Sequence, residues 1–231
     1  MYLPMFNPMF YLFALPALLL GFYAQHKVRS TYSKYSKMRN RANMTGYEAA
    51  ERLLRINGLH NVSIKETSGQ LSDHYDPRNK QLALSAGVAR SPSVAALGIV
   101  AHEVGHALQD HQGYVPLKIR GGMVPAVQLG SWLGPILFFV GMLFPVGNLS
   151  LIGLLLFSGT LVFSLVTLPV EFNASRRAVA ILNQGGMVNA EEAKAAKQVL
   201  NAAALTYVAA AAQALSTILY YVFLMGGRRR R

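Results

Sequence analysis

Residues 121–170 read GGMVPAVQLGSWLGPILFFVGMLFPVGNLSLIGLLLFSGTLVFSLVTLPV, a run of fifty residues without a single charge. A helix needs about 20 apolar residues to cross the hydrocarbon core of a bilayer, so this run can hold two crossings. We predict spans near 124–145 and 149–170, with a turn at Pro145-Val-Gly-Asn148 because proline and glycine interrupt helices. The run therefore predicts a transmembrane hairpin.

Two further stretches, 1–24 and 198–227, also carry no charge and predict spans near 6–24 and 205–225. The last of these contains Gln213 and Ser216, which leaves open a helix buried against protein instead of lipid. Hydrophobic residues make up 52% of the chain and charged residues 14%, against about 25% charged in an average soluble domain. The composition excludes a disordered chain and favours a membrane protein.

The basic residues indicate which side of the membrane the polar regions occupy. Residues 26–120 and 171–197 together hold 18 of the 22 Lys and Arg. Three predicted crossings separate the N-terminus from 171–197, so both regions share one side, which the positive-inside rule assigns to the cytoplasm. The tail Arg228–Arg231 conflicts with this assignment, because four full crossings would place it on the opposite side.

Charge and cysteine content limit the partners. A net charge of +12 in so apolar a chain predicts contact with an anionic lipid bilayer. The sequence has no glycine-rich phosphate loop and no nucleic-acid module, so we expect no nucleic-acid partner. It contains no cysteine, which excludes disulfides, thiolate metal sites and a cysteine nucleophile.

The polar region 26–120 predicts a small α+β unit. Thr45 and Glu48 form a capping box that predicts a helix over 46–57. The alternating segments 61–67 and 80–85 predict strands. Ser91 and Pro92 predict the start of a helix over 92–112, in which Gly98 and Gly105 would permit close approach of another backbone. A second capping box, Asn189 to Glu192, predicts a short helix that leads into the last apolar segment.

The helix predicted over 92–112 contains His102-Glu-Val-Gly-His106. Positions i and i+4 share one helix face, so both imidazoles can bind one ion. Zn²⁺ suits such nitrogen ligands, and it activates a water molecule for attack on a carbonyl carbon. Glu103 can accept the proton of that water, so we predict it as the catalytic base.

A catalytic zinc site needs a third protein ligand. Glu171 is the best candidate, because a carboxylate at the membrane boundary costs free energy unless it is solvated or paired. An ion pair with Arg176 or Arg177 is the alternative explanation for it. His111 follows His106 by five residues, a spacing that does not suit a ligand.

The zinc motif, the apolar hairpin and Glu171-Phe-Asn-Ala-Ser175 together resemble the YugP-type neutral zinc metallopeptidases of bacterial membranes. These are gluzincin-like and similar to the HtpX and CAAX-prenyl-protease type membrane proteases. The resemblance covers nearly the whole chain, including residues 71–77 and 169–174. It implies that Glu171 is the third ligand. Ser175 stands where those proteases usually have an Asp that supports a ligand histidine.

A peptidase also needs a place for substrate and donors for the oxyanion. Gluzincin-like enzymes bind extended substrate along an edge strand, for which the segment Lys80–Ser85 is the candidate; an ordinary internal strand is the alternative. His74 and Arg176 are the preferred oxyanion donors among the polar side chains near the motifs, which also include Tyr75 and Tyr207.

The sequence thus predicts a mostly α membrane protein with about four transmembrane helices and a small α+β, zincin-like cytoplasmic domain. We expect a zinc metallopeptidase of the cell membrane that acts on peptides or membrane proteins at the cytoplasmic surface. A non-catalytic zinc-binding adaptor is the alternative. We expect a first transmembrane helix over 1–25, the metallopeptidase domain over 26–120 and the hairpin over 121–170. Cytoplasmic helices with the third ligand should follow over 171–204, and a last apolar helix with a basic tail over 205–231.

Overall fold

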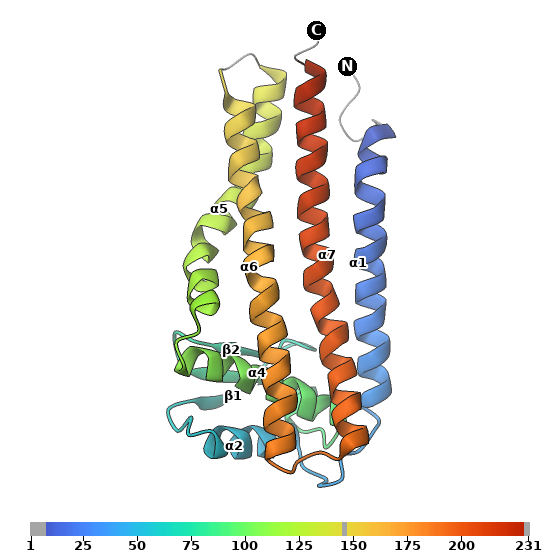
Figure 1. Ribbon diagram of the computed structural model, residues 1–231, viewed down its shortest axis with the longest axis vertical. Coiled ribbons are helices and arrows are strands. Elements are labelled where there is room, and N and C mark those ends of the chain that lie inside the picture. The colour runs from blue at the N-terminus through green and yellow to red at the C-terminus, as the bar shows by residue number, and fades with distance from the viewer. Residues whose placement is uncertain (1–7, 145–146, 229–231) are drawn as a thin grey trace. The chain divides into compact units, whose positions relative to one another are not determined.

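The computed structural model describes residues 8–144 and 147–228. Within them, four helices are long and apolar enough to cross a membrane (Figure 1). Most side chains in their apolar windows are not buried within the protein by itself, as helices that face lipid require. The prediction of a mostly α membrane protein is confirmed. The four helices are α1 (Pro8–Tyr35), α5 (Val115–Leu143), α6 (Leu149–Gln184) and α7 (Ala190–Arg228).

The chain divides into two compact units, and each of the four long helices contributes residues to both. The membrane unit consists of the described residues within 1–25, 119–168 and 205–231. Its core is an aromatic cluster in which Phe138 stacks on Tyr221 at 4.0 Å between ring centroids. Polar contacts in this unit include the Ser216 hydroxyl, which donates to the Phe13 carbonyl.

Glycines let α5 and α6 pack closely in the membrane unit. A Cβ on Gly153 would lie 2.3 Å from the Phe138 nitrogen, and one on Gly134 would lie 2.9 Å from the Gly153 carbonyl oxygen. Small residues at a helix interface allow this backbone approach, which is a main source of helix association in lipid. Pro145 and Val146 of the predicted turn lie outside the described residues, as do positions 6 and 7 of the first predicted span and Arg229–Arg231 of the tail.

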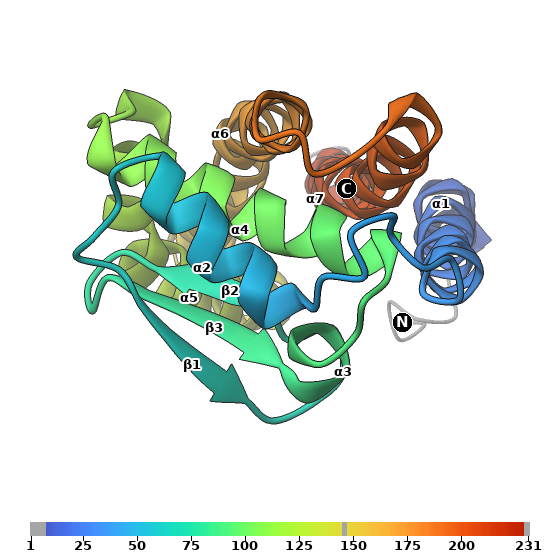
Figure 2. The ribbon, with the colours of Figure 1, turned by 90° about the horizontal axis from the view of Figure 1, so that it is seen from below.

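The second unit comprises residues 26–118 and 169–204, and we call it the catalytic unit because it contains the predicted base Glu103 and the predicted metal ligands (Figure 2). Its sheet has the order β1-β3-β2, with β1 parallel and β2 antiparallel to β3. The strand predicted over 80–85 is therefore central, and its proposed use as a free substrate edge is wrong. The elements that complete this unit are α2 (Gly46–Ile56), β1 (Ser63–Thr67), β2 (His74–Asp76), β3 (Gln81–Ser85), α3 (Ala86–Ala89) and α4 (Val94–His111).

Capping residues begin the helices of the catalytic unit. Both hydrogen bonds of the predicted Thr45–Glu48 box are present at the start of α2. The start of α4 is Val94 and not Pro92, because the Ser93 hydroxyl accepts from the Ala96 N–H. Asn189 and Glu192 also exchange both capping bonds. They open α7, which continues without a break to Arg228, so the predicted helix does lead into the last apolar segment and forms one long helix with it.

The helix α4 lies between the sheet and the polar turns of α6 (Figure 2). A Cβ on Gly105 would lie 2.7 Å from the Ala174 carbonyl oxygen, so only glycine permits this approach without a shift. Leu97, Val100 and Val104 of α4 are buried in the apolar core of the unit. This packing brings the residues around Glu171 against the middle of α4.

Candidate metal centre

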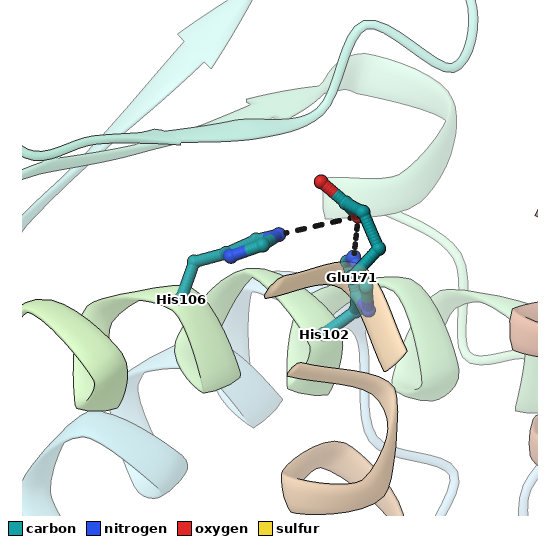
Figure 3. A group of neighbouring side chains, drawn as sticks. All are labelled: His102, His106 and Glu171. Carbon is teal, nitrogen blue, oxygen red and sulfur yellow. Dashed lines mark hydrogen bonds and ion pairs between the residues drawn. The ribbon is translucent and has the colours of Figure 1, made fainter. Parts of the chain in front are cut away.

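Three predicted ligands converge in the catalytic unit (Figure 3). His102 and His106 project from successive turns of α4, and Glu171 reaches them from α6. The Glu171 Oε2 atom lies 3.2 Å from His102 Nε2 and 3.6 Å from His106 Nε2. One donor atom from each residue lies within 4.8 Å of the others. In the part of the chain that the structure describes, this is the one group of three such side chains.

These separations suit a tetrahedral zinc ion. Ligands at about 2.1 Å from one ion, at tetrahedral angles, lie about 3.4 Å from each other. The observed 3.2 and 3.6 Å bracket this value. Two imidazoles and one carboxylate also match the donor types of catalytic zinc sites that keep one position open. The residues present therefore fit the metal.

The other ring nitrogens are occupied by protein partners, which selects the tautomer. His106 Nδ1 lies 3.0 Å from the Gln109 amide oxygen, and His102 Nδ1 lies 3.2 Å from Ser175 Oγ. An amide oxygen only accepts, so His106 Nδ1 carries the proton; Ser175 Oγ can accept from His102 in the same way. With the protons on Nδ1, both Nε2 atoms can offer a lone pair to a cation.

Gln109 is a site residue that the sequence analysis missed. It is fully buried, and its amide nitrogen donates to the Val170 carbonyl at 2.8 Å and to Asn173 at 3.0 Å. It thereby links His106 to the helix that carries Glu171. A polar residue three positions after His106, on the same helix face, was the available signal.

Glu103 lies beside the three converging side chains and is 9% exposed. Its Oε2 atom accepts a hydrogen bond from the Tyr75 N–H at 3.0 Å, so β2 holds the carboxylate. Burial raises the pKa of Glu103, because desolvation disfavours the charged form. The strand is anchored in turn by Asp73, whose carboxylate accepts from the N–H and the hydroxyl of Ser85.

The remaining candidates lie apart from this group. His74 is exposed, and its Nδ1 lies 2.9 Å from the Ser72 carbonyl oxygen. Arg176 is exposed on α6, and His111 is exposed at the end of α4. The structure places none of them among the converging donors, so the oxyanion role of His74 and Arg176 stays a prediction.

The Glu171 carboxylate forms ion-pair contacts with the two histidines, while the alternative of an ion pair with Arg176 or Arg177 stays a prediction. The Arg177 guanidinium donates to Asn173 at 2.7 Å and to Gln112 at 2.6 Å. Partners of the Glu171 carboxylate include the two histidines. The buried carboxylate is thus placed for a cation held jointly with the imidazoles.

The combination of four apolar helices with the donor group His102, His106 and Glu171 is typical of membrane metallopeptidases. The chain matches the family described as "Putative neutral zinc metallopeptidase" over residues 10–226, and it belongs to that family. It is 43% identical over 221 residues to the "Putative membrane protease YugP" of Bacillus subtilis (strain 168). The match covers 95% of this chain and 98% of that protein. No solved structure matches the chain.

Proposed function

We propose that this protein is a zinc-dependent membrane peptidase in which His102, His106 and Glu171 bind the metal. The observation that carries the proposal is the convergence of two Nε2 atoms and one carboxylate oxygen next to the buried Glu103. A purely structural zinc site needs no such base. The family and the relative from Bacillus subtilis support the same class of activity.

A zinc ion held by His102, His106 and Glu171 would supply Lewis-acid polarisation of a substrate carbonyl and a lowered pKa for a water molecule. Glu103 accepts the water proton as the carbonyl carbon is attacked. We assign the proton to Oε1, because Oε2 already accepts the Tyr75 N–H. The raised pKa of Glu103 makes its carboxylate a stronger base, and the acid that results can then protonate the leaving amine.

We assign substrate binding to the outer edge of β2, because β3 is the central strand. The Tyr75 N–H points away from β3, since it donates to Glu103. In an antiparallel strand the N–H and C=O of one residue face the same side, so the Tyr75 carbonyl can accept from an extended polypeptide. Main-chain pairing of this kind suits peptides and unfolded segments of membrane proteins.

We propose that the catalytic unit faces the cytoplasm, on the strength of the 18 basic residues in 26–120 and 171–197. Because the chain contains no cysteine, single-cysteine labelling tests this directly. We expect a membrane-impermeant maleimide added to intact cells to label Gly227→Cys and not His60→Cys. Labelling of His60→Cys in intact cells would indicate the opposite orientation.

Cleavage of casein and of peptides by wild type and Glu103→Gln distinguishes a peptidase from a zinc-binding adaptor. We expect equal zinc content in both and a loss of activity of about 10²- to 10⁴-fold in Glu103→Gln, the usual contribution of a general base. Tyr47→Phe, an exposed change on α2, serves as the control. Equal inactivity of wild type and variant, across several lipids and peptides, would favour the adaptor.

A further inference from the structure

A network of three side chains ties β2 to the far end of α4. The Tyr75 hydroxyl donates to Asp110 Oδ2 at 2.7 Å, and the Lys80 ammonium forms an ion pair with the same oxygen. The Asp110 side chain is 17% exposed. Tyr75 therefore contacts α4 twice, through its N–H at Glu103 and through its hydroxyl at Asp110.

The spacing on α4 makes this double contact a clamp. Glu103 and Asp110 are seven residues apart, which is about two helical turns and about 10 Å along one face. A tyrosine whose backbone lies at one turn and whose hydroxyl lies at the other cannot slide along the helix without breaking a hydrogen bond. Burial and the bond to Asp110 raise the pKa of Tyr75, so its hydroxyl remains a donor.

The conformation of Lys80 is a second, independent observation. This residue ends the turn between β2 and β3 with a φ of 50°, in the left-handed region. Hairpin turns favour glycine or asparagine at such positions, because a side chain there is strained. The strained lysine directs its ammonium to Asp110, which neutralises a partly buried carboxylate.

We propose that Asp110, through the Tyr75 hydroxyl, is a positioning residue that fixes the Tyr75 N–H and so aims Glu103 for proton transfer. This inference rests on the proposed peptidase function. Asp110 itself touches neither the converging ligands nor the proposed proton, so it acts only through Tyr75. Its loss should leave the metal in place and change the rate of the chemical step.

The test uses the full chain in detergent with bound zinc, comparing wild type, Tyr75→Phe and Asp110→Ala, with Tyr47→Phe as the matched control. We expect kcat to fall about tenfold in both variants while KM and zinc content are unchanged. The double variant should lose no more kcat than either single variant, because both substitutions break the same hydrogen bond. Amide hydrogen exchange at Tyr75 should be faster in both.

A merely structural role would instead lower zinc content and raise KM together with the loss of kcat, and the two changes would add. Lower zinc content with a raised KM would overturn the inference, and so would additive effects of the two substitutions. An unchanged kcat in Tyr75→Phe would also overturn it. If Asp110→Ala does not fold, Tyr75→Phe decides, since it keeps the ring and removes only the hydroxyl. An inactive wild type would overturn the proposed function itself, whereas active wild type with unaffected variants overturns the positioning role alone.

Discussion

The membrane unit and the catalytic unit are built from the same long helices, yet different interactions hold them together. All ten Asp and Glu residues lie in the catalytic unit, within 26–118 and 169–204. The membrane unit packs through glycines and stacked aromatic rings, as in the contact of Phe138 with Tyr221. In lipid an unpaired charge is costly, so acidic groups gather where they can be solvated, paired or bound to a metal.

Both units nevertheless depend on glycine at one close helix contact. Gly153 of α6 lies against α5 in the membrane unit, and Gly105 of α4 lies against α6 in the catalytic unit. The first contact only holds helices together. The second also sets the distance between Glu171 and the two histidines, so an equal change in the two units should have unequal consequences.

The largest expected effect comes from removing a proposed ligand. We expect His106→Ala to lose stoichiometric zinc and at least about 10³-fold in peptidase activity, because two donors do not complete a catalytic zinc site. Metal analysis of the purified protein and peptide cleavage measure the two effects. His111→Ala, at an exposed histidine five residues further on, is the control and should retain both. Full zinc content in His106→Ala would refute the assigned ligand set.

Gly105→Ala should come next. Its Cβ would lie 2.7 Å from a backbone oxygen of α6, so the helices must separate, at a cost of about 1–3 kcal/mol. If that cost falls on the metal-bound arrangement, zinc affinity drops about 5- to 150-fold. Competition with a chelator measures it, and Gly121→Ala, whose Cβ would meet nothing within 4 Å, is the control. Unchanged affinity would mean that α6 can shift without moving Glu171.

Gly153→Ala applies the same substitution to the membrane unit. A Cβ there would lie 2.3 Å from the Phe138 nitrogen, so we expect the free energy of unfolding to fall by about 1–3 kcal/mol. Zinc affinity of the folded protein should stay as in wild type. Thermal unfolding in detergent and the chelator competition measure the two quantities side by side. A loss of zinc affinity equal to that of Gly105→Ala would abolish the contrast between the units.

The smallest effect concerns the partner of His102. Removing the Ser175 hydroxyl in Ser175→Ala should weaken zinc binding by about tenfold, the lower end of the range for such outer partners. Ser175→Asp should strengthen it, because a carboxylate accepts the Nδ1 proton more strongly than a hydroxyl does. The same chelator competition ranks the three proteins. Equal affinities would show that this hydrogen bond has no influence on the ligand.

Much of the architecture was predictable because its signals are local. Fifty uncharged residues indicate a hairpin in a bilayer whatever surrounds them, and the pair Thr45–Glu48 caps its helix with its own side chains. The spacing of His102 and His106 is likewise a property of one helix. The two imidazoles can therefore be placed on one helix face without knowledge of the rest of the fold.

Other features depend on residues that are distant in the sequence. We expected the segment 80–85 to be an edge strand, but β3 lies between β1 and β2. Alternation within a segment predicts a strand and not its place in the sheet, which depends on packing against α4. Gln109 and the Tyr75 N–H entered the site in the same way. Gln109 bonds to Val170 and Asn173 of α6, and the Tyr75 N–H bonds to Glu103 of α4; no pattern within a single segment reports these links between elements.

The sequence therefore predicted which side chains take part in the chemistry of the site, but not how they are oriented toward one another. Ligand types, the base and the membrane spans follow from side-chain chemistry and from helical or bilayer repeat lengths. The meeting of Glu171 with His102 and His106, and the hydrogen bond that orients Glu103, exist only once α4, α6 and β2 pack together. His102 and Glu171 are 69 residues apart in the sequence, and most of the chain between them forms the apolar hairpin of α5 and α6. The sequence of that hairpin does not determine their distance, which is set by how the core packs.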